Sequence, residues 1–197
     1  MKNCWYADNR DLVKWSVLVN LAVENSASLI LQIAYFQEHD FSKVELGEKE
    51  KEIPKEVLAH FRDIRNIERI SSPIKVHVFN KLITDRKQYL LEAKEFIALH
   101  AEDRNVVFLD PDTGLEPTRN PTLKHVLNKE ANEFWTKLKA GDTLALYQHQ
   151  TTKNGNPWVE SKREQFENAI KAPRGSVKVG RGLKLAKDVV LFYAVKT

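Results

Sequence analysis

The chain has 197 residues, of which 42% are hydrophobic and 29% are charged, and its formal net charge is +4. This composition is typical of a globular protein and excludes wholesale disorder. The length fits one domain, residues 1–197, with a core that needs no disulfides. Cys4 is the single cysteine, which excludes an intrachain disulfide and favours a reducing cytoplasm. No apolar run has signal-peptide or membrane-span length, so we expect a cytoplasmic protein without a membrane partner.

Helices and strands are expected to alternate along most of the chain. Asp8 is a good N-cap for a first helix, which should end near Asn25. Short apolar runs predict strands at residues 28–36, 74–79, 105–109 and 143–149. Apolar residues at helical spacing predict further helices at residues 54–66, 84–101, 121–139 and 159–170. The polar residues 39–52 are expected to form an exposed loop.

The last two predicted strands, residues 176–179 and 189–195, are joined by a short connection, so they should be antiparallel. The alternation before them favours a mostly parallel sheet that is covered by helices on both faces. The predicted fold class is therefore α/β, a Rossmann-like three-layer sandwich with a C-terminal antiparallel strand pair.

The strongest candidate site is the turn Asp110-Pro111-Asp112-Thr113-Gly114, which follows the third strand. Ligands of open α/β sheets bind beyond the carboxyl ends of the strands, and an apolar strand that stops on an acid places that acid at the rim. We therefore predict that Asp110 and Asp112 are catalytic. They could bind Mg²⁺ or Mn²⁺, divide into acid and base, or accept a hydrogen bond from a substrate amine. A structural turn is the alternative, because the same residues have turn chemistry.

His149 is the third predicted catalytic residue. It ends the strand at 143–149, and we expect it to face the same crevice as Asp110, as a base, a ligand or a phosphate donor. The alternative is a strand-end histidine that is bonded to the backbone. Gln148 is predicted to contact substrate, although neighbouring strand residues alternate faces.

Charged residues near the first helix are candidate ligands of an anion. Asp8, Arg10 and Lys14 lie around its start, and a helix N-terminus favours negative charge. Capping and surface ion pairs are the alternative explanation.

The C-terminal part of the chain is basic. Residues 171–197 contain seven lysines and arginines against one acidic side chain, Asp188. Arg181 lies among them, between two glycines, and is predicted to bind substrate or anion. Such a surface attracts phosphates, which makes nucleic acid or a nucleotide the expected partner. Lysines that blunt an edge strand are the alternative.

Two resemblances bear on function. Three segments together resemble a bacterial and phage protein family from which no particular activity follows: Tyr6-x-Asp8-x-Arg10-Asp11-x-x-Lys14, Val107-Phe108-Leu109-Asp110-Pro111-Asp112-x-Gly114 and Tyr147-Gln148-His149. More distantly, a strand followed by Asp-Pro, a helix, a strand, a helix and a terminal antiparallel pair resembles the second half of Rossmann-type methyltransferases. In the amino-methylating members an Asp-Pro-Pro-Tyr motif ends that strand. Its Asp or Asn accepts a hydrogen bond from the target amine, and its aromatic residue stacks on the base.

Only Asp110 and Pro111 match that motif, since Asp112 and Thr113 replace its second proline and its aromatic residue. A glycine-rich loop for S-adenosylmethionine is absent where residues 32–37 stand, and the chain has no Walker sequence. We predict a methyltransferase-like enzyme that acts on nucleic acid or a nucleotide, with S-adenosylmethionine as a candidate cofactor. One alternative is a nuclease or phosphodiesterase with Mg²⁺ or Mn²⁺ on Asp110 and Asp112. The other is a non-catalytic nucleic-acid-binding or regulatory protein.

Overall fold

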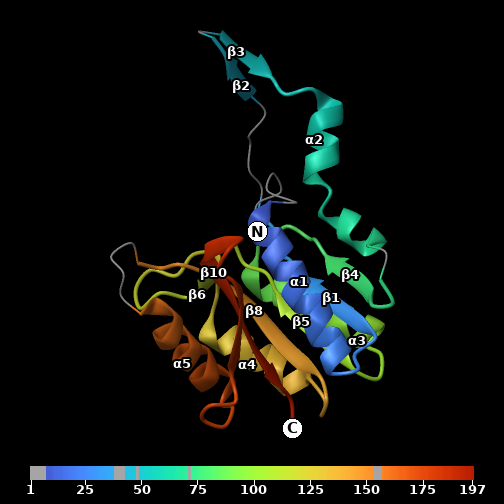
Figure 1. Ribbon diagram of the computed structural model, residues 1–197, viewed down its shortest axis with the longest axis vertical. Helices are drawn as coiled ribbons and strands as arrows, with labels where there is room; N and C mark the ends of the chain where they lie inside the picture. Colours follow the sequence, from blue (N-terminus) through green and yellow to red (C-terminus); the bar gives the residue numbers. More distant parts are fainter. Residues whose placement is uncertain (1–7, 38–42, 48, 71, 153–156) are drawn as a thin grey trace.

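The computed structural model describes residues 8–37, 43–47, 49–70, 72–152 and 157–197. Its centre is a six-stranded sheet in the order β4-β1-β5-β8-β10-β9 (Figure 1). The parallel part of this sheet consists of β4 (Lys75–Phe79), β1 (Leu29–Ile33), β5 (Asn105–Leu109) and β8 (Thr143–His149). The remaining two strands, β10 (Ala186–Val195) and β9 (Lys178–Gly182), form the antiparallel pair, and β10 is also antiparallel to β8. The predicted Rossmann-like α/β sandwich is confirmed.

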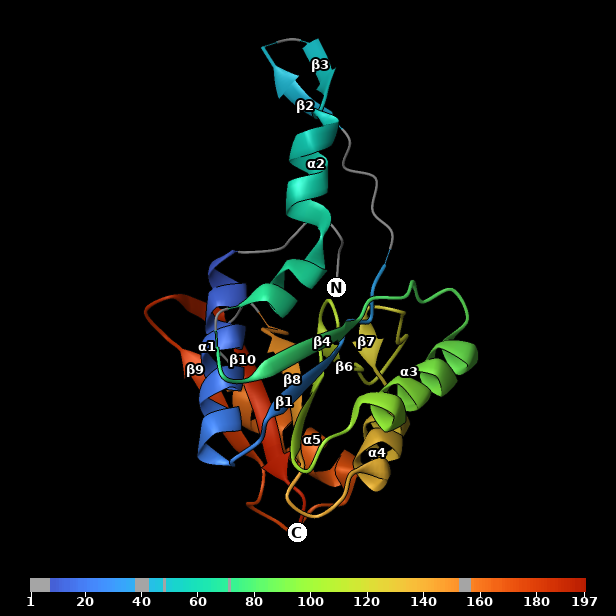
Figure 2. The ribbon, with the colours of Figure 1, turned by 90° about the vertical axis from the view of Figure 1, so that its right-hand side faces the viewer.

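Helices cover both faces of the sheet (Figure 2). One face is covered by α1 (Asn9–Glu24) and the 3-10 helix η1 (Ile64–Arg69). The other face is covered by α3 (Arg86–His100), α4 (Asn128–Lys137) and α5 (Trp158–Ile170). Because successive strand residues point to opposite faces, each central strand contributes to both cores. In β1, for example, Leu31 packs with the three-helix side and Ile30 with the α1 side.

The first helix forms where its capping signal predicts. The Asp8 carboxylate accepts hydrogen bonds from the backbone N–H groups of Arg10 and Asp11, at 2.8 and 2.9 Å. These groups would otherwise lack partners at the first turn. In the part of the chain that the structure describes, no helix combines the length and the apolar character that crossing a bilayer requires.

An arm projects from the edge of the sheet at which the parallel strands end (Figures 1 and 2). It consists of the hairpin β2 (Lys43–Leu46) and β3 (Lys49–Glu52), followed by α2 (Lys55–Arg62). The expectation of a loop at residues 39–52 is therefore wrong for the described residues 43–47 and 49–52, while 39–42 and 48 lie outside the described residues. Gly47 has φ +65°, a backbone conformation that suits a tight hairpin turn.

Two predicted helices have different boundaries. The helix predicted at residues 54–66 ends at Arg62, and its Val57 side chain is 42% exposed because α2 stands clear of the core. The helix predicted at residues 121–139 begins only at Asn128, because the preceding residues form the short strand β7 (His125–Val126) beside β6 (Gly114–Leu115).

Candidate ligand-binding site

A cavity of about 340 Å³ opens at the carboxyl ends of β5 and β8, beside the first turns of α1. We call it the Asp110 cavity. Three separate stretches of the chain line it: Asp8, Arg10, Asp11 and Lys14; Asp110, Pro111, Asp112 and Thr113; and Tyr147 and His149. The structure thus brings together six of the eight predicted site residues. The strand order explains this, because neighbouring parallel strands end at one edge of the sheet.

Asp110 lies at the bottom of this cavity and is 1% exposed. Its backbone N–H donates to the carbonyl of Ile33, which continues the pairing of β5 with β1 by one residue. Its carboxylate accepts a hydrogen bond of 2.7 Å from the Gln32 amide and lies 3.2 and 3.3 Å from the Lys14 Nζ atom. Burial raises the pKa of the Asp110 carboxyl, and the Lys14 ammonium opposes that shift.

Lys14 is buried between two carboxylates. Its Nζ atom lies 2.6 Å from Asp11, one turn earlier on α1, and it also contacts Asp110. The same atom lies 4.8 Å from the centre of the Tyr147 ring. Burial alone would lower the pKa of Lys14, but the carboxylates of Asp110 and Asp11 raise it above its ordinary value. Among the described residues, one ammonium therefore serves two buried carboxylates.

A second charge cluster lies where β10 begins. Arg10 donates two hydrogen bonds to Asp188 Oδ2, from Nε at 3.1 Å and from a terminal nitrogen at 2.6 Å. The same oxygen lies 3.1 Å from His149 Nε2. The hydrogen bond from Arg10 lowers the pKa of Asp188. His149 Nδ1 lies 3.2 Å from the carbonyl oxygen of Gln150, so both ring nitrogens of His149 already have partners.

Asp112 differs from the other carboxylates of the cavity. It is half-buried, and it makes no hydrogen bond or ion pair with any residue in the described ranges. The turn around it is held by backbone contacts, since the N–H of Thr113 donates to Lys124 and the carbonyl of Thr113 accepts from His149. The Asp112 carboxylate is therefore an acceptor that a ligand can reach.

Gln148 does not line the Asp110 cavity. It points to the opposite face of β8 from Tyr147 and His149, as strand alternation requires. It is fully buried there, where its side chain accepts from the N–H of Leu115 at 2.9 Å and donates to the carbonyl of His149 at 2.7 Å. It also lies so close to Gly114 that a β-carbon at that position would overlap it. The structure thus corrects the predicted substrate contact: Gln148 supports the Asp110 turn from below.

Arg181 also lies apart from the cavity. It lines a separate groove of about 360 Å³ between α1 and β9, on an exposed part of β9. Because β9 is the edge strand of the sheet, Arg181 does not share the Asp110 cavity with Arg10 and Lys14, and its binding of substrate or anion stays a prediction.

The residues around Asp110 do not fit the predicted Mg²⁺ or Mn²⁺ site. No group of three or more His, Cys, Asp or Glu side chains that could hold a metal ion occurs within the described ranges. Hard divalent cations take several oxygen ligands. Here Asp112 stands without a second metal-binding partner, and the Lys14 ammonium already neutralises Asp110.

The end of β1 does not fit S-adenosylmethionine in the manner that the methyltransferase resemblance implies. Tyr35 stands where a glycine-rich loop would be needed, and it has a left-handed backbone with φ +42°. Its side chain is fully buried, and its hydroxyl donates to Glu130 at 3.1 Å. Glu130 in turn accepts hydrogen bonds of 2.7 and 2.8 Å from Arg86. The hydrogen-bonded Tyr35 side chain and the ion pair between Glu130 and Arg86 therefore occupy this strand end.

Two residues of the site were missed by sequence reasoning: Gln32 and Asp188. Each carries a signal in the sequence. Gln32 is a polar residue within an apolar strand, and Asp188 is the single acidic side chain of residues 171–197. A buried polar residue needs a partner, but the sequence does not say which one.

In comparisons with protein-family models, curated proteins and solved structures, the chain matches none of them. The two resemblances described above therefore stay predictions, and the site has to be interpreted from its own chemistry.

Proposed function

We propose that the Asp110 cavity binds a small ligand through N–H donors, and that this ligand is the amino-bearing base of a nucleoside or of nucleic acid. One observation carries the proposal: the charged donors of the cavity are paired within the protein, whereas the Asp112 carboxylate is an acceptor without a partner in the described ranges. Lys14 is paired with Asp110 and Asp11, and Arg10 with Asp188. A ligand that offers donors satisfies what the cavity lacks.

The charge of the cavity supports the same choice. Four carboxylates line it against two basic side chains, Arg10 and Lys14, and Asp188 adds a fifth carboxylate close by. A phosphate would enter against this negative potential. The proposal therefore favours the neutral amino-bearing base over the phosphate group, in contrast to the anion site expected for Asp8, Arg10 and Lys14.

The volume is consistent with a small ligand. Ligand pockets span roughly 300–1,000 Å³, and the Asp110 cavity, at about 340 Å³, lies at the lower end of that range. The Tyr147 ring is 6% exposed and lies against Lys14, so it offers no free face for stacking. Recognition rests on hydrogen bonds to the base edge.

The test compares bases that differ in one amino group. Thermal unfolding is measured with adenosine against purine riboside, and with cytidine against 2-pyrimidinone riboside, which lack the amino group and carry no N–H donor on the base. We expect adenosine or cytidine to raise the Tm, with the two analogues at least about tenfold weaker, because a lost hydrogen bond to a charged acceptor costs about 1.5–3 kcal/mol. Asp112→Asn should abolish the shift, whereas Asp103→Asn, at an exposed position outside the cavity, should retain it. Equal binding of the bases with and without the amino group, or full binding by Asp112→Asn, would refute the proposal.

A non-catalytic binding role is the second candidate, and a specific observation favours it. Both ring nitrogens of His149 are engaged, and Asp110 is held by Gln32 and Lys14. Neither His149 nor Asp110 is therefore poised as a free general base. Binding of an amino-bearing base without turnover over hours, by chromatography of the recovered ligand, would favour this role, whereas a modified base would favour an enzyme.

A further inference from the structure

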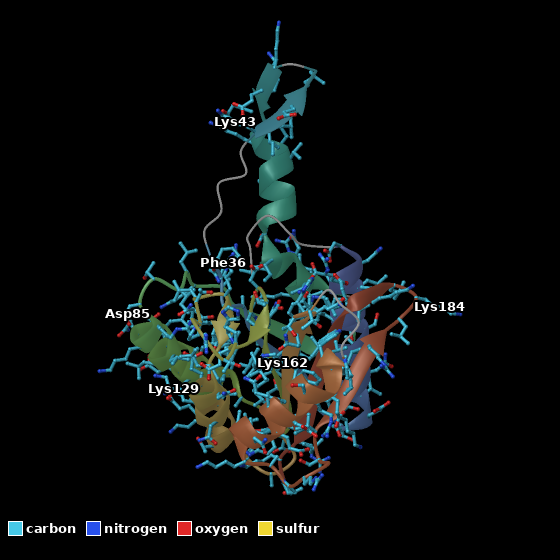
Figure 3. The ribbon with its side chains drawn as sticks, turned by 90° about the vertical axis from the view of Figure 1, so that its left-hand side faces the viewer. Phe36, Lys43, Asp85, Lys129, Lys162 and Lys184 are labelled. Carbon is cyan, nitrogen blue, oxygen red and sulfur yellow. The ribbon has the colours of Figure 1, made fainter. Side chains whose placement is uncertain are left out.

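The hairpin at the tip of the arm has an open strand edge that no other described segment of the chain covers. All eight residues of β2 and β3 are exposed, including Val44 at 50% and Leu46 at 70%. Figure 3 shows Lys43 at this tip, far from Lys184 on the body of the molecule. An isolated two-stranded hairpin is at best marginally stable in water, and three or more strands are needed for independent stability.

The two outer edges of the hairpin differ in what they can pair with. The register within the hairpin places Lys43 opposite Glu52, Val44 opposite Lys51, Glu45 opposite Glu50 and Leu46 opposite Lys49. Antiparallel pairing of a strand with its own copy has a two-fold axis perpendicular to the sheet, and paired residues then share a face. Along β3, where lysine and glutamate alternate, every such register places lysine opposite lysine or glutamate opposite glutamate, which is unfavourable.

The β2 edge can pair with its own copy. With Val44 on the two-fold axis, Lys43 of each chain lies opposite Glu45 of the other, and the two Val44 side chains meet. The directions in which the backbone N–H and C=O groups of β2 point also agree with this register. Hydrogen-bonded and non-hydrogen-bonded pairs alternate along an antiparallel ladder. In a hairpin with a two-residue connection, the backbone groups of Leu46 and Val44 form their hydrogen bonds with β3. The N–H and C=O groups of Lys43 and Glu45 are then the ones that face the open edge.

The charge of the arm argues against a polyanion as its partner. Within the described hairpin, three lysines stand against three glutamates, so the balanced sequence gives no electrostatic attraction to nucleic acid. We propose that a second copy of this chain covers the β2 edge, which gives a four-stranded sheet in the order β3-β2-β2-β3 across a two-fold axis at Val44. This inference is independent of the ligand of the Asp110 cavity.

The test uses a charge swap in the full chain, followed by sedimentation velocity over a concentration series. Glu45→Lys should weaken self-association by roughly tenfold or more, because two attractive cross-strand pairs become repulsive. Folding of the hairpin is preserved, since Lys at position 45 would face Glu50 in its own chain. The double variant K43E/E45K should restore association. Glu56→Lys is the matched control, because it makes the same charge change at an exposed position of α2 outside the hairpin, and it should associate as the unaltered chain does.

A second measurement places the axis. In a background without Cys4, Val44→Cys should form an intermolecular disulfide under mild oxidation, because non-hydrogen-bonded pairs bring their Cα atoms to about 4.5 Å. Lys49→Cys, on the outer strand, should not. A chain that stays monomeric at all concentrations, equal effects of Glu45→Lys and Glu56→Lys, or a Lys49→Cys disulfide that forms as fast as that of Val44→Cys would overturn the proposal.

Discussion

Replacing Lys14 by methionine tests the charge cluster on which the Asp110 cavity depends. The substitution keeps most of the side-chain volume but removes the ammonium, and it leaves the carboxylates of Asp11 and Asp110 buried at 4% and 1% exposure. At 3.2 Å from Nζ to Asp110 Oδ1, the attraction is about 5 kcal/mol at an effective dielectric constant near 20. Breaking a buried ion pair by removing one partner costs about 3–5 kcal/mol.

We therefore expect Lys14→Met to lower the free energy of unfolding by about 3–5 kcal/mol at pH 7. For a chain of this size that corresponds to a fall in Tm of about 6–20 °C. Urea and thermal unfolding, followed by far-ultraviolet circular dichroism, measure both quantities. Adding Asp110→Asn to Lys14→Met should recover part of the loss, because the double variant no longer buries that unpaired carboxylate.

The loss of unfolding free energy caused by Lys14→Met should also depend on pH, and its direction follows from the pKa of Asp110. Burial raises the pKa of Asp110 above its ordinary value of 3.8, so the folded state holds that proton more tightly than the unfolded state. Such a group contributes stability at low pH, and the contribution is lost as the pH rises through the folded-state pKa. Without Lys14, which opposes the shift, the destabilisation should be smaller at pH 4 than at pH 7. A loss below about 1 kcal/mol at pH 7, or one that grows on acidification, would refute a buried ionic cluster.

Three further substitutions give measurable outcomes. Gly114→Ala should destabilise by about 2 kcal/mol or more, because φ is +130° and the new methyl group would overlap Gln148; an unchanged urea midpoint would contradict this. Glu130→Gln should cost about 3 kcal/mol, since it leaves the Arg86 guanidinium without its carboxylate; a thermal midpoint within 2 °C of the unaltered chain would show that water already solvates the pair. Asp188→Asn should cost at most about 1 kcal/mol at pH 7, because the pair is about one-third exposed. The pKa of Asp188 is lowered by its guanidinium partner, so this small difference should vanish as the pH falls below 3.8; a difference that persists at pH 2 would point to packing instead.

The central sheet could be predicted from sequence because its signal is local. Residues 105–109 and 143–149 are short apolar runs, and both strands have the predicted bounds. The arm could not be predicted in this way, because β2 and β3 bury nothing and so lack an apolar pattern that distinguishes them from a loop. The start of α4 was misplaced for a different reason. The carbonyls of Thr122 and His125 accept hydrogen bonds from Arg86, a contact between segments far apart in the chain.

In the candidate site, too, features with a local sequence signal could be predicted, whereas features that depend on contacts distant in sequence could not. The position of Asp110 at a strand end follows from the strand itself and from the rule for open α/β sheets. Its ionic partner does not, because Lys14 approaches from a helix that is 96 residues away in sequence. The alternation of side chains along β8 also places His149 and Gln148 on opposite faces of the sheet, although both are polar and adjacent in sequence. This alternation allows the face of each strand residue to be predicted from sequence once the face of one neighbour is known.

The helix that precedes the first strand determines the chemistry of the cavity more than the Asp110 turn does. The turn alone offers two carboxylates, which is why a metal site was a reasonable expectation. α1 delivers Arg10, Asp11 and Lys14 to the same edge, and Lys14 neutralises the inner carboxylate while Asp112 keeps its acceptor capacity. If Lys14 has this role, Lys14→Met should change which ligands bind, because Asp110 then keeps its hydrogen bond from Gln32 but loses its cationic partner. A titration should show stronger binding of cationic amines to that variant than to Asp112→Asn, and the reverse order would mean that Asp110 stays closed to ligands even without its lysine.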